Sequence, residues 1–196
     1  MWPWGHLAVG YLCYALVLRV RRRSVDGATA LLLVVGTQLP DVVDKPLAWV
    51  GVLPAGRSLA HSLLVAVPLA ALVLTIARRA DRLEPAAGFV FGYGSHLFAD
   101  SYRSLFAGQF EDLTFLLWPV LPLPDYGRDS PVDHFDALVR AAERLDPAIV
   151  LREPMGAFTG QVALFVLAGA VWLSGGAPGV ALLWRVVRRV FGGDRD

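Results

Sequence analysis

One short stretch, Gly92-Tyr-Gly-Ser-His-Leu-Phe-Ala-Asp100, places a histidine and an aspartate four residues apart inside an apolar segment. On a helix this spacing puts the imidazole of His96 and the carboxylate of Asp100 on the same face, one turn apart. Ionisable groups are costly in such an apolar segment, so the pair needs a partner or a chemical function. Imidazole and carboxylate are ligands of zinc and similar divalent metals, and the pair therefore indicates part of a metal site.

Four further ionisable residues lie within or at the end of other apolar runs: His6, Asp41, Asp44 and His61. Together with His96 and Asp100 they could hold a divalent ion, whose charge would lower the pKa of a coordinated water toward about 7 and produce a nucleophile for hydrolysis. With three carboxylates, either two ions or one ion with an aspartate general base is compatible with the sequence. Each residue alone also has a structural explanation, such as a hydrogen-bonded pair, a turn or a helix cap.

The segments that carry these residues are long and apolar. Of the 196 residues, 56% are hydrophobic and 18% are charged, whereas a soluble domain has about 25% charged residues. Apolar runs of roughly 17 to 25 residues can cross a bilayer as helices. The expected fold class is therefore all-α, a single integral membrane domain over residues 1–196 with about five transmembrane helices. These helices are expected at 1–18, 28–43, 59–77, 86–105 and 158–173.

Arginine clusters predict the orientation of this bundle. They follow the first and third apolar runs and recur near the chain end, at residues 19–23, 78–82 and 185–189. Basic residues favour the cytoplasmic side of a membrane, so we expect the N-terminus outside and the C-terminus in the cytoplasm. All six candidate ligands then lie in the outward half of the membrane, at depths compatible with one site. Arg57 is the main exception to the charge rule, which makes it a candidate for a specific role.

The remaining segments are expected to lie at membrane surfaces. Pro40 is expected to end or kink the second helix, residues 47–53 to lie at the outer interface, and the proline-broken stretch 115–124 to be interfacial or re-entrant. Residues 125–154 form an extracytoplasmic polar segment, in which Ser130-Pro-Val-Asp133 is typical of a helix start. This amphipathic surface helix carries His134, either solvated or reaching back toward the site. Residues 182–196 form a basic cytoplasmic tail.

Five short motifs follow one another along the chain: His6, Pro40-Asp41-Val-Val-Asp44, Arg57-Ser-Leu-Ala-His61-Ser62, Gly94-Ser-His96 with Asp100, and Leu116-Leu-Trp-Pro119. Over residues 5–122 this order resembles a prokaryotic family of membrane-bound, metal-dependent hydrolases, also described as LexA-binding, inner-membrane-associated hydrolases. The resemblance implies metal ligands at His6, Asp41 or Asp44, His61, His96 and Asp100, and a location in a prokaryotic plasma membrane. The family usually has a histidine where this chain has Gly56 and a threonine where it has Ala60, so one accessory ligand or donor is expected to be missing.

A weaker resemblance is to zinc-dependent phospholipase C and the related fungal single-strand nucleases. These all-α enzymes also use an early histidine, an aspartate, a histidine and a His-x-x-x-Asp helix. They further use the amino group of an N-terminal tryptophan, whereas here Met1 precedes Trp2. The partial likeness points to phosphate esters as substrates.

The first hypothesis is a membrane-embedded hydrolase with one or two divalent ions, zinc by preference, acting on a phosphoester or lipid-like substrate at the outer side. His6, Asp41, His61, His96 and Asp100 would bind metal, Asp44 would be a ligand or general base, and Arg57 would hold an anionic group of the substrate. The same residues could instead form a transporter or a pathway for protons or metal ions, and a third hypothesis is a non-catalytic membrane scaffold. The bilayer is the expected partner, the net charge of +1 does not favour nucleic acid, and the sequence does not identify protein partners.

Overall fold

The computed structural model describes residues 1–126, 130–143, 152 and 157–191. Throughout this part of the chain the regular elements are helices, which confirms the expected all-α fold. In chain order they are α1 (Pro3–Val20), α2 (Gly27–Trp49), α3 (Leu63–Arg79), α4 (Leu83–Ala107), the 3₁₀ helix η1 (Phe110–Leu117), α5 (Pro131–Glu143), α6 (Phe158–Ser174) and α7 (Val180–Phe191).

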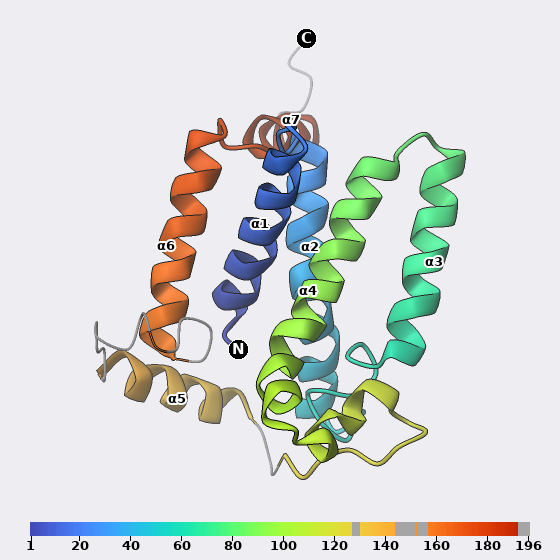
Figure 1. Cartoon of the computed structure of the whole chain (residues 1–196), viewed down its shortest axis with the longest axis vertical. Coiled ribbons are helices and arrows are strands. Elements are labelled where there is room, and N and C mark those ends of the chain that lie inside the picture. Colours follow the sequence, from blue (N-terminus) through green and yellow to red (C-terminus); the bar gives the residue numbers. More distant parts are fainter. Residues whose placement is uncertain (127–129, 144–151, 153–156, 192–196) are drawn as a thin grey trace.

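The helices α1, α2, α3, α4 and α6 form a bundle in which consecutive helices run in opposite directions (Figure 1). Helix α2 packs against α4. Helix α1 contacts α6, α2 and α4, and helix α3 contacts α4. The short helix α7 lies across one end of the bundle, while η1 and α5 lie at the other end (Figure 1). The arginine-rich turns after α1 and α3 are at the α7 end, and the first residues of α1 are at the opposite end.

The five expected spans correspond to the five bundle helices. Within the described ranges, however, no helix combines the length and the apolar content needed to cross a membrane. The expected end of the second helix at Val43 is wrong, because α2 continues through Pro40 and Pro46 to Trp49. An interior proline costs a helix about 3 kcal/mol, and here packing against α4 on both sides of Pro40 outweighs that cost.

Two stripes of residues with a spacing of four determine how α2 meets α4. The α4 stripe is Gly88, Gly92, His96 and Asp100, and the α2 stripe is Thr29, Leu33, Thr37 and Asp41. A Cβ atom on Gly92 would lie 2.5 Å from the carbonyl oxygen of Leu33, and one on Gly36 would lie 2.2 Å from that of Phe89. Glycine thus allows the two backbones to approach closely, and the antiparallel pairing brings Asp41 near His96 and Asp100.

Two small apolar clusters fill the bundle. Ala8, Tyr11, Tyr14, Leu33 and Ala168 pack between α1, α2 and α6, and Ala66, Phe89, Tyr93 and Leu97 pack between α3 and α4. Many large apolar side chains remain exposed on the outer faces of the bundle helices, among them Leu16, Val20, Val67, Leu72, Ile76 and Val166. The bundle therefore presents an extensive apolar surface.

The end opposite α7 is closed by irregular segments. The third expected span begins at Leu63 and not at Leu59, because residues 59–62 belong to the loop between α2 and α3. Within the stretch 115–124, Phe115 is 1% exposed and the carbonyl of Trp118 accepts a hydrogen bond of 2.6 Å from Ser62 Oγ. This stretch consequently packs over the loop that carries His61.

The expected surface helix is present as α5. It begins as predicted, with the Asp133 N–H donating to Ser130 Oγ at 3.2 Å, and its apolar residues Val132 and Phe135 are exposed. His134 lies beside Trp49, with 5.8 Å between ring centroids. The predicted polar segment and basic tail are described only in part, since residues 127–129, 144–151, 153–156 and 192–196 lie outside the described residues.

Candidate metal centre

The structure brings together the six candidate ligands from four parts of the chain. His6 comes from α1, Asp41 and Asp44 from α2, His61 from the loop before α3, and His96 and Asp100 from α4. Two groups of three have ligand atoms within 4.8 Å of one another: His6, His96 and Asp100, and Asp41, His61 and His96. His96 belongs to both groups, so the donors form one continuous cluster.

His61 and His96 face each other through their Nε2 atoms, which lie 3.1 Å apart. The Nδ1 atom of His61 lies 2.8 Å from Asp44 Oδ2, and Nδ1 of His96 lies 2.7 Å from the carbonyl oxygen of Thr37. Both partners are acceptors, so each Nδ1 carries the donated proton, and when both rings are neutral each presents a lone pair at Nε2. Two lone pairs at this distance repel each other, and a cation bound between them would remove the repulsion. Histidines that bind metals show this pattern of hydrogen bonding at the other ring nitrogen.

His6 adds a third imidazole to the cluster. Its ring stacks on that of His96 with 3.8 Å between centroids and 17° between planes. Its Nε2 atom lies 3.3 Å from Asp100 Oδ1, and its buried Nδ1 atom has no hydrogen-bond partner among the described residues. An orphaned buried nitrogen is rare in native proteins, and it fits a donor set that binds an ion.

Asp100 is the most highly connected carboxylate of the centre, with 2% of its side chain exposed. Oδ1 accepts from the Met1 amino nitrogen at 3.1 Å, and Oδ2 lies 2.9 Å from Arg57 Nε and 3.5 Å from His61 Nε2. A buried carboxylate is costly unless cations or donors surround it. These contacts hold Asp100 ionised at the centre.

Asp41 joins the centre from α2. Its Oδ1 atom lies 3.7 Å from His61 Nε2 and 3.9 Å from His96 Nε2, while Oδ2 accepts from Lys45 Nζ at 2.7 Å. The sequence analysis did not find this contact. The spacing of four residues on one helix is the signal that could have found it.

Asp44 lies behind His61. Its oxygens accept from the backbone N–H groups of Ser58 and Ala60, both at 2.8 Å, and of His61 at 3.2 Å, besides the His61 ring. Tyr93 supports the same loop by donating its hydroxyl to the carbonyl of Ala60. These contacts are those of a residue that positions His61. The sequence analysis had left Asp44 as either a ligand or a general base. Sequence reasoning missed Tyr93, because its partner lies on a distant segment.

Arg57 stands at the edge of the cluster, with 34% of its side chain exposed. Its guanidinium carbon lies 5.8 Å from the centre of the Tyr126 ring, another contact that the sequence analysis did not find. Burial lowers the pKa of the guanidinium, but Asp100, Tyr126 and Asp41 together outweigh it and raise the pKa overall. Arg57 thus remains a cation beside the buried donors.

His134 is not part of either group of donors. The two positions that depart from the resembled family also have no direct place among the ligands: the backbone of Ala60 binds Asp44 and Tyr93, and Gly56 lies in the same loop. The centre is assembled from α1, α2, α4 and the loop that precedes α3.

Residues 1–176 match the family model described as YdjM inner membrane protein. The chain belongs to the YdjM inner membrane protein family. No curated protein and no solved structure matches the chain. The residues matched to the YdjM family contain the whole candidate metal centre and the bundle through the end of α6 at Ser174, while α7 begins beyond them at Val180. Membership of the YdjM family supports a membrane location.

Proposed function

We propose that this protein is a membrane-embedded, metal-dependent hydrolase that acts on a phosphate ester or a lipid-like substrate. The observation that carries the proposal is the pair of Nε2 atoms of His61 and His96, which face each other at 3.1 Å within a buried cluster of carboxylates. When both rings are neutral, the two Nε2 lone pairs repel each other unless a cation lies between them. The resemblance to metal-dependent hydrolases stated above supports the same assignment.

The donor set fits zinc. Nitrogen and carboxylate oxygen are its usual ligands together with thiolate, and the five donors that we assign as ligands are His6, Asp41, His61, His96 and Asp100. The two groups of three share His96, and the donor set is compatible with one or two ions. When bound, a divalent ion supplies Lewis-acid activation of water and of a substrate oxygen. Asp44 positions the ring of His61 and keeps its proton on Nδ1.

Two partly exposed cations favour an anionic substrate. Lys45 and Arg57 have 20% and 34% of their side chains exposed, whereas the carboxylates that they contact, Asp41 and Asp100, are buried. Arginine and lysine bind phosphate through charge-assisted hydrogen bonds, so we assign to Arg57, with help from Lys45, the binding of the phosphoryl group. In the hydrolysis, water oxygen bonds to phosphorus, the phosphorus–oxygen bond to the leaving group breaks, and the leaving group takes up the proton that water releases.

We place the bundle in a prokaryotic plasma membrane, with its exposed apolar faces against lipid. The arginine-rich end that carries α7 then lies on the cytoplasmic side, and the metal centre and the N-terminus lie at the outer side. Membership of the inner membrane protein family supports the location. The orientation rests on the distribution of arginines.

Elemental analysis of the purified protein tests the centre. We expect one or two divalent ions per chain, lost in His96→Ala and in Asp100→Ala and retained in His134→Ala, which removes the one histidine outside the centre. Full metal content in the first two variants would contradict the proposal. Hydrolysis of phosphomonoester, phosphodiester and phospholipid substrates by the metal-loaded protein then tests the reaction. Metal binding without hydrolysis, but with ion flux in proteoliposomes, would favour the ion-pathway alternative.

A further inference from the structure

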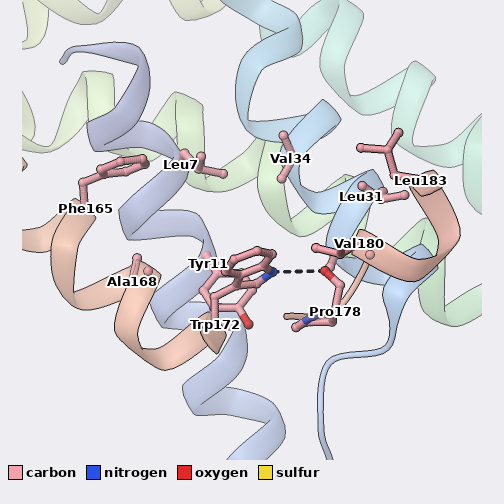
Figure 2. Close-up of a pocket in the computed structure, with 13 residues that line it drawn as sticks. Leu7, Tyr11, Leu31, Val34, Phe165, Ala168, Trp172, Pro178, Val180 and Leu183 are labelled. Atoms are coloured by element: carbon pink, nitrogen blue, oxygen red, sulfur yellow. Dashed lines mark hydrogen bonds between the residues drawn. The ribbon is translucent and has the colours of Figure 1, made fainter. Parts of the chain in front are cut away.

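A second feature lies away from the metal centre, between α1, α2, α6 and α7. It is an apolar cavity of about 400 Å³, within the range of roughly 300–1,000 Å³ that is typical of ligand sites. Figure 2 shows Leu7, Tyr11, Phe165 and Trp172 on one side of it and Leu31, Val34, Pro178, Val180 and Leu183 on the other. None of the metal ligands assigned above lines this cavity.

The walls of the cavity offer little to a polar ligand. The indole Nε1 of Trp172 already donates to the carbonyl oxygen of Pro178 at 3.0 Å (Figure 2). The remaining lining side chains are almost all aliphatic or aromatic. Because a buried polar group without a partner is costly, the part of a ligand inside the cavity must be hydrocarbon.

One end of the cavity adjoins a smaller, basic one. This second cavity, of about 180 Å³, shares Tyr11 and Pro178 with the first and is also lined by Arg19, Arg23 and Ser174. Arg23 forms an ion pair with Glu84. Arg19 is exposed and forms no ion pair with any described residue, so its charge is open to a ligand. An apolar cavity beside the exposed guanidinium of Arg19 fits a molecule with an apolar chain and an anionic head.

Helix α7 closes one side of the apolar cavity. The turn before α7 packs on the start of α2, where a Cβ atom on Gly27 would lie 3.1 Å from the backbone nitrogen of Gly179. From this position Val180 and Leu183 line the apolar cavity. Arg185, Arg188 and Arg189 follow at positions that share one face of the helix, so this end of the bundle is apolar inside and cationic outside.

We propose that the paired cavities form a binding site for an anionic phospholipid. One acyl chain occupies the apolar cavity between α1, α2, α6 and α7, and the phosphate pairs with Arg19 at its basic end. Because the chain belongs to an inner membrane protein family, it is expected to meet anionic phospholipids at high concentration in the membrane. The site is separate from the metal centre and does not depend on the proposed hydrolase activity.

Native mass spectrometry of the delipidated full chain in detergent tests the site, with phosphatidylglycerol as the anionic probe and phosphatidylethanolamine as the zwitterionic one. We expect one retained phosphatidylglycerol per chain, about tenfold preferred over phosphatidylethanolamine. Gly169→Leu fills the apolar cavity, because a Cβ atom there meets nothing within 4 Å, and should abolish retention. Gly94→Leu is the matched control, since Gly94 also has open space but lines a different apolar cavity between α3 and α4.

Arg19→Gln tests the charge separately and, being a surface change, leaves the fold intact. It should remove the preference for phosphatidylglycerol while a lipid is still retained. Thermal unfolding of both glycine variants shows that each is folded. Equal retention by Gly169→Leu and the unaltered chain would overturn the proposal, as would equal retention of the two lipids by the unaltered chain or preference for free oleic acid over phosphatidylglycerol.

Discussion

His61 and His96 present their Nε2 atoms to each other at 3.1 Å, and each ring is held there by an acceptor at its Nδ1 atom. The acceptor for His61 is a carboxylate on α2, and the acceptor for His96 is a backbone carbonyl on α2. One helix therefore sets the tautomer of both rings. This arrangement orients the two Nε2 atoms toward each other, as the binding of a shared cation would require.

Removal of bound metal should lower the stability of the folded protein. An ion that binds only the native state stabilises it by about 2.7 kcal/mol at a free concentration of 100 times its Kd. We therefore expect a chelator to lower the midpoint of thermal unfolding and added Zn²⁺ to restore it, as measured in detergent. In His96→Ala neither treatment should shift the midpoint, and an equal shift in that variant would place the ion elsewhere.

Asp44→Asn should weaken metal binding without abolishing it. The amide nitrogen would replace one of the two accepting oxygens and face either the N–H of Ala60 or the N–H groups of Ser58 and His61, so the support of His61 would weaken. Loss of such a supporting residue costs roughly 10- to 100-fold in metal affinity. Metal titration should show full occupancy at high Zn²⁺ in this variant. If Asp44→Asn loses a whole equivalent of metal even there, Asp44 is a ligand.

Arg57→Gln should raise KM for a phosphate ester substrate more than it lowers kcat. A charge-assisted hydrogen bond contributes about 1.5–3 kcal/mol, which corresponds to a change of about ten- to a hundredfold. Arg57→Lys should recover part of the loss because it keeps the charge but not the planar fork. Arg140→Gln, on the exposed helix α5, is the control for a changed surface charge. An unchanged KM in Arg57→Gln would exclude the assigned role.

Gly92→Ala should destabilise the bundle and disturb the centre. The added methyl group would lie 2.5 Å from the carbonyl oxygen of Leu33 and 3.1 Å from the backbone nitrogen of Thr37, so α4 and α2 must separate. Gly94→Ala is the control on the same helix, because its Cβ atom meets nothing within 4 Å. There, replacing glycine in a helix should be neutral or stabilise by about 0.5–1 kcal/mol. Similar unfolding midpoints for the two variants would contradict the close approach.

Asp26→Ala should lower the free energy of unfolding at neutral pH by about 1 kcal/mol, since Asp26 caps α2 by accepting from the N–H groups of Ala28 and Thr29. Burial raises the pKa of Asp26, but the hydrogen bonds from Thr29 and Ala28 outweigh it and lower the pKa overall. A lowered pKa stabilises the fold above the ordinary pKa of an aspartate, and the contribution is lost as the pH falls through the folded-state value.

The difference between the unaltered chain and Asp26→Ala should accordingly shrink in acid. Asp26→Asn keeps an accepting oxygen and should retain most of the cap without this dependence on pH. Denaturant unfolding at neutral and acidic pH measures both effects. A difference between the unaltered chain and Asp26→Ala that stays constant into acid would show that the ionised carboxylate does not stabilise α2.

The sequence alone determined the helical class and the residues that meet in the centre. Apolar runs bounded by arginines indicate helices, and an ionisable residue inside such a run is conspicuous because burying it is costly. The spacing of His96 and Asp100 follows from helix geometry alone. For this reason His6, Asp41, Asp44, His61, His96 and Asp100 could all be named before the structure was known.

The tertiary structure decided which of these residues face the cluster of Nε2 atoms and which only support a neighbouring residue. Asp41 and Asp44 are three residues apart on one helix, and nothing in their spacing shows that one faces two Nε2 atoms while the other holds the loop behind His61. The sequence also did not show three other features: the carbonyl of Thr37 as the partner of His96, the Tyr126 ring beside Arg57, and the continuation of α2 through Pro40. Each depends on contacts between segments far apart in the chain, and only the close packing of α2 against α4 brings those contacts about.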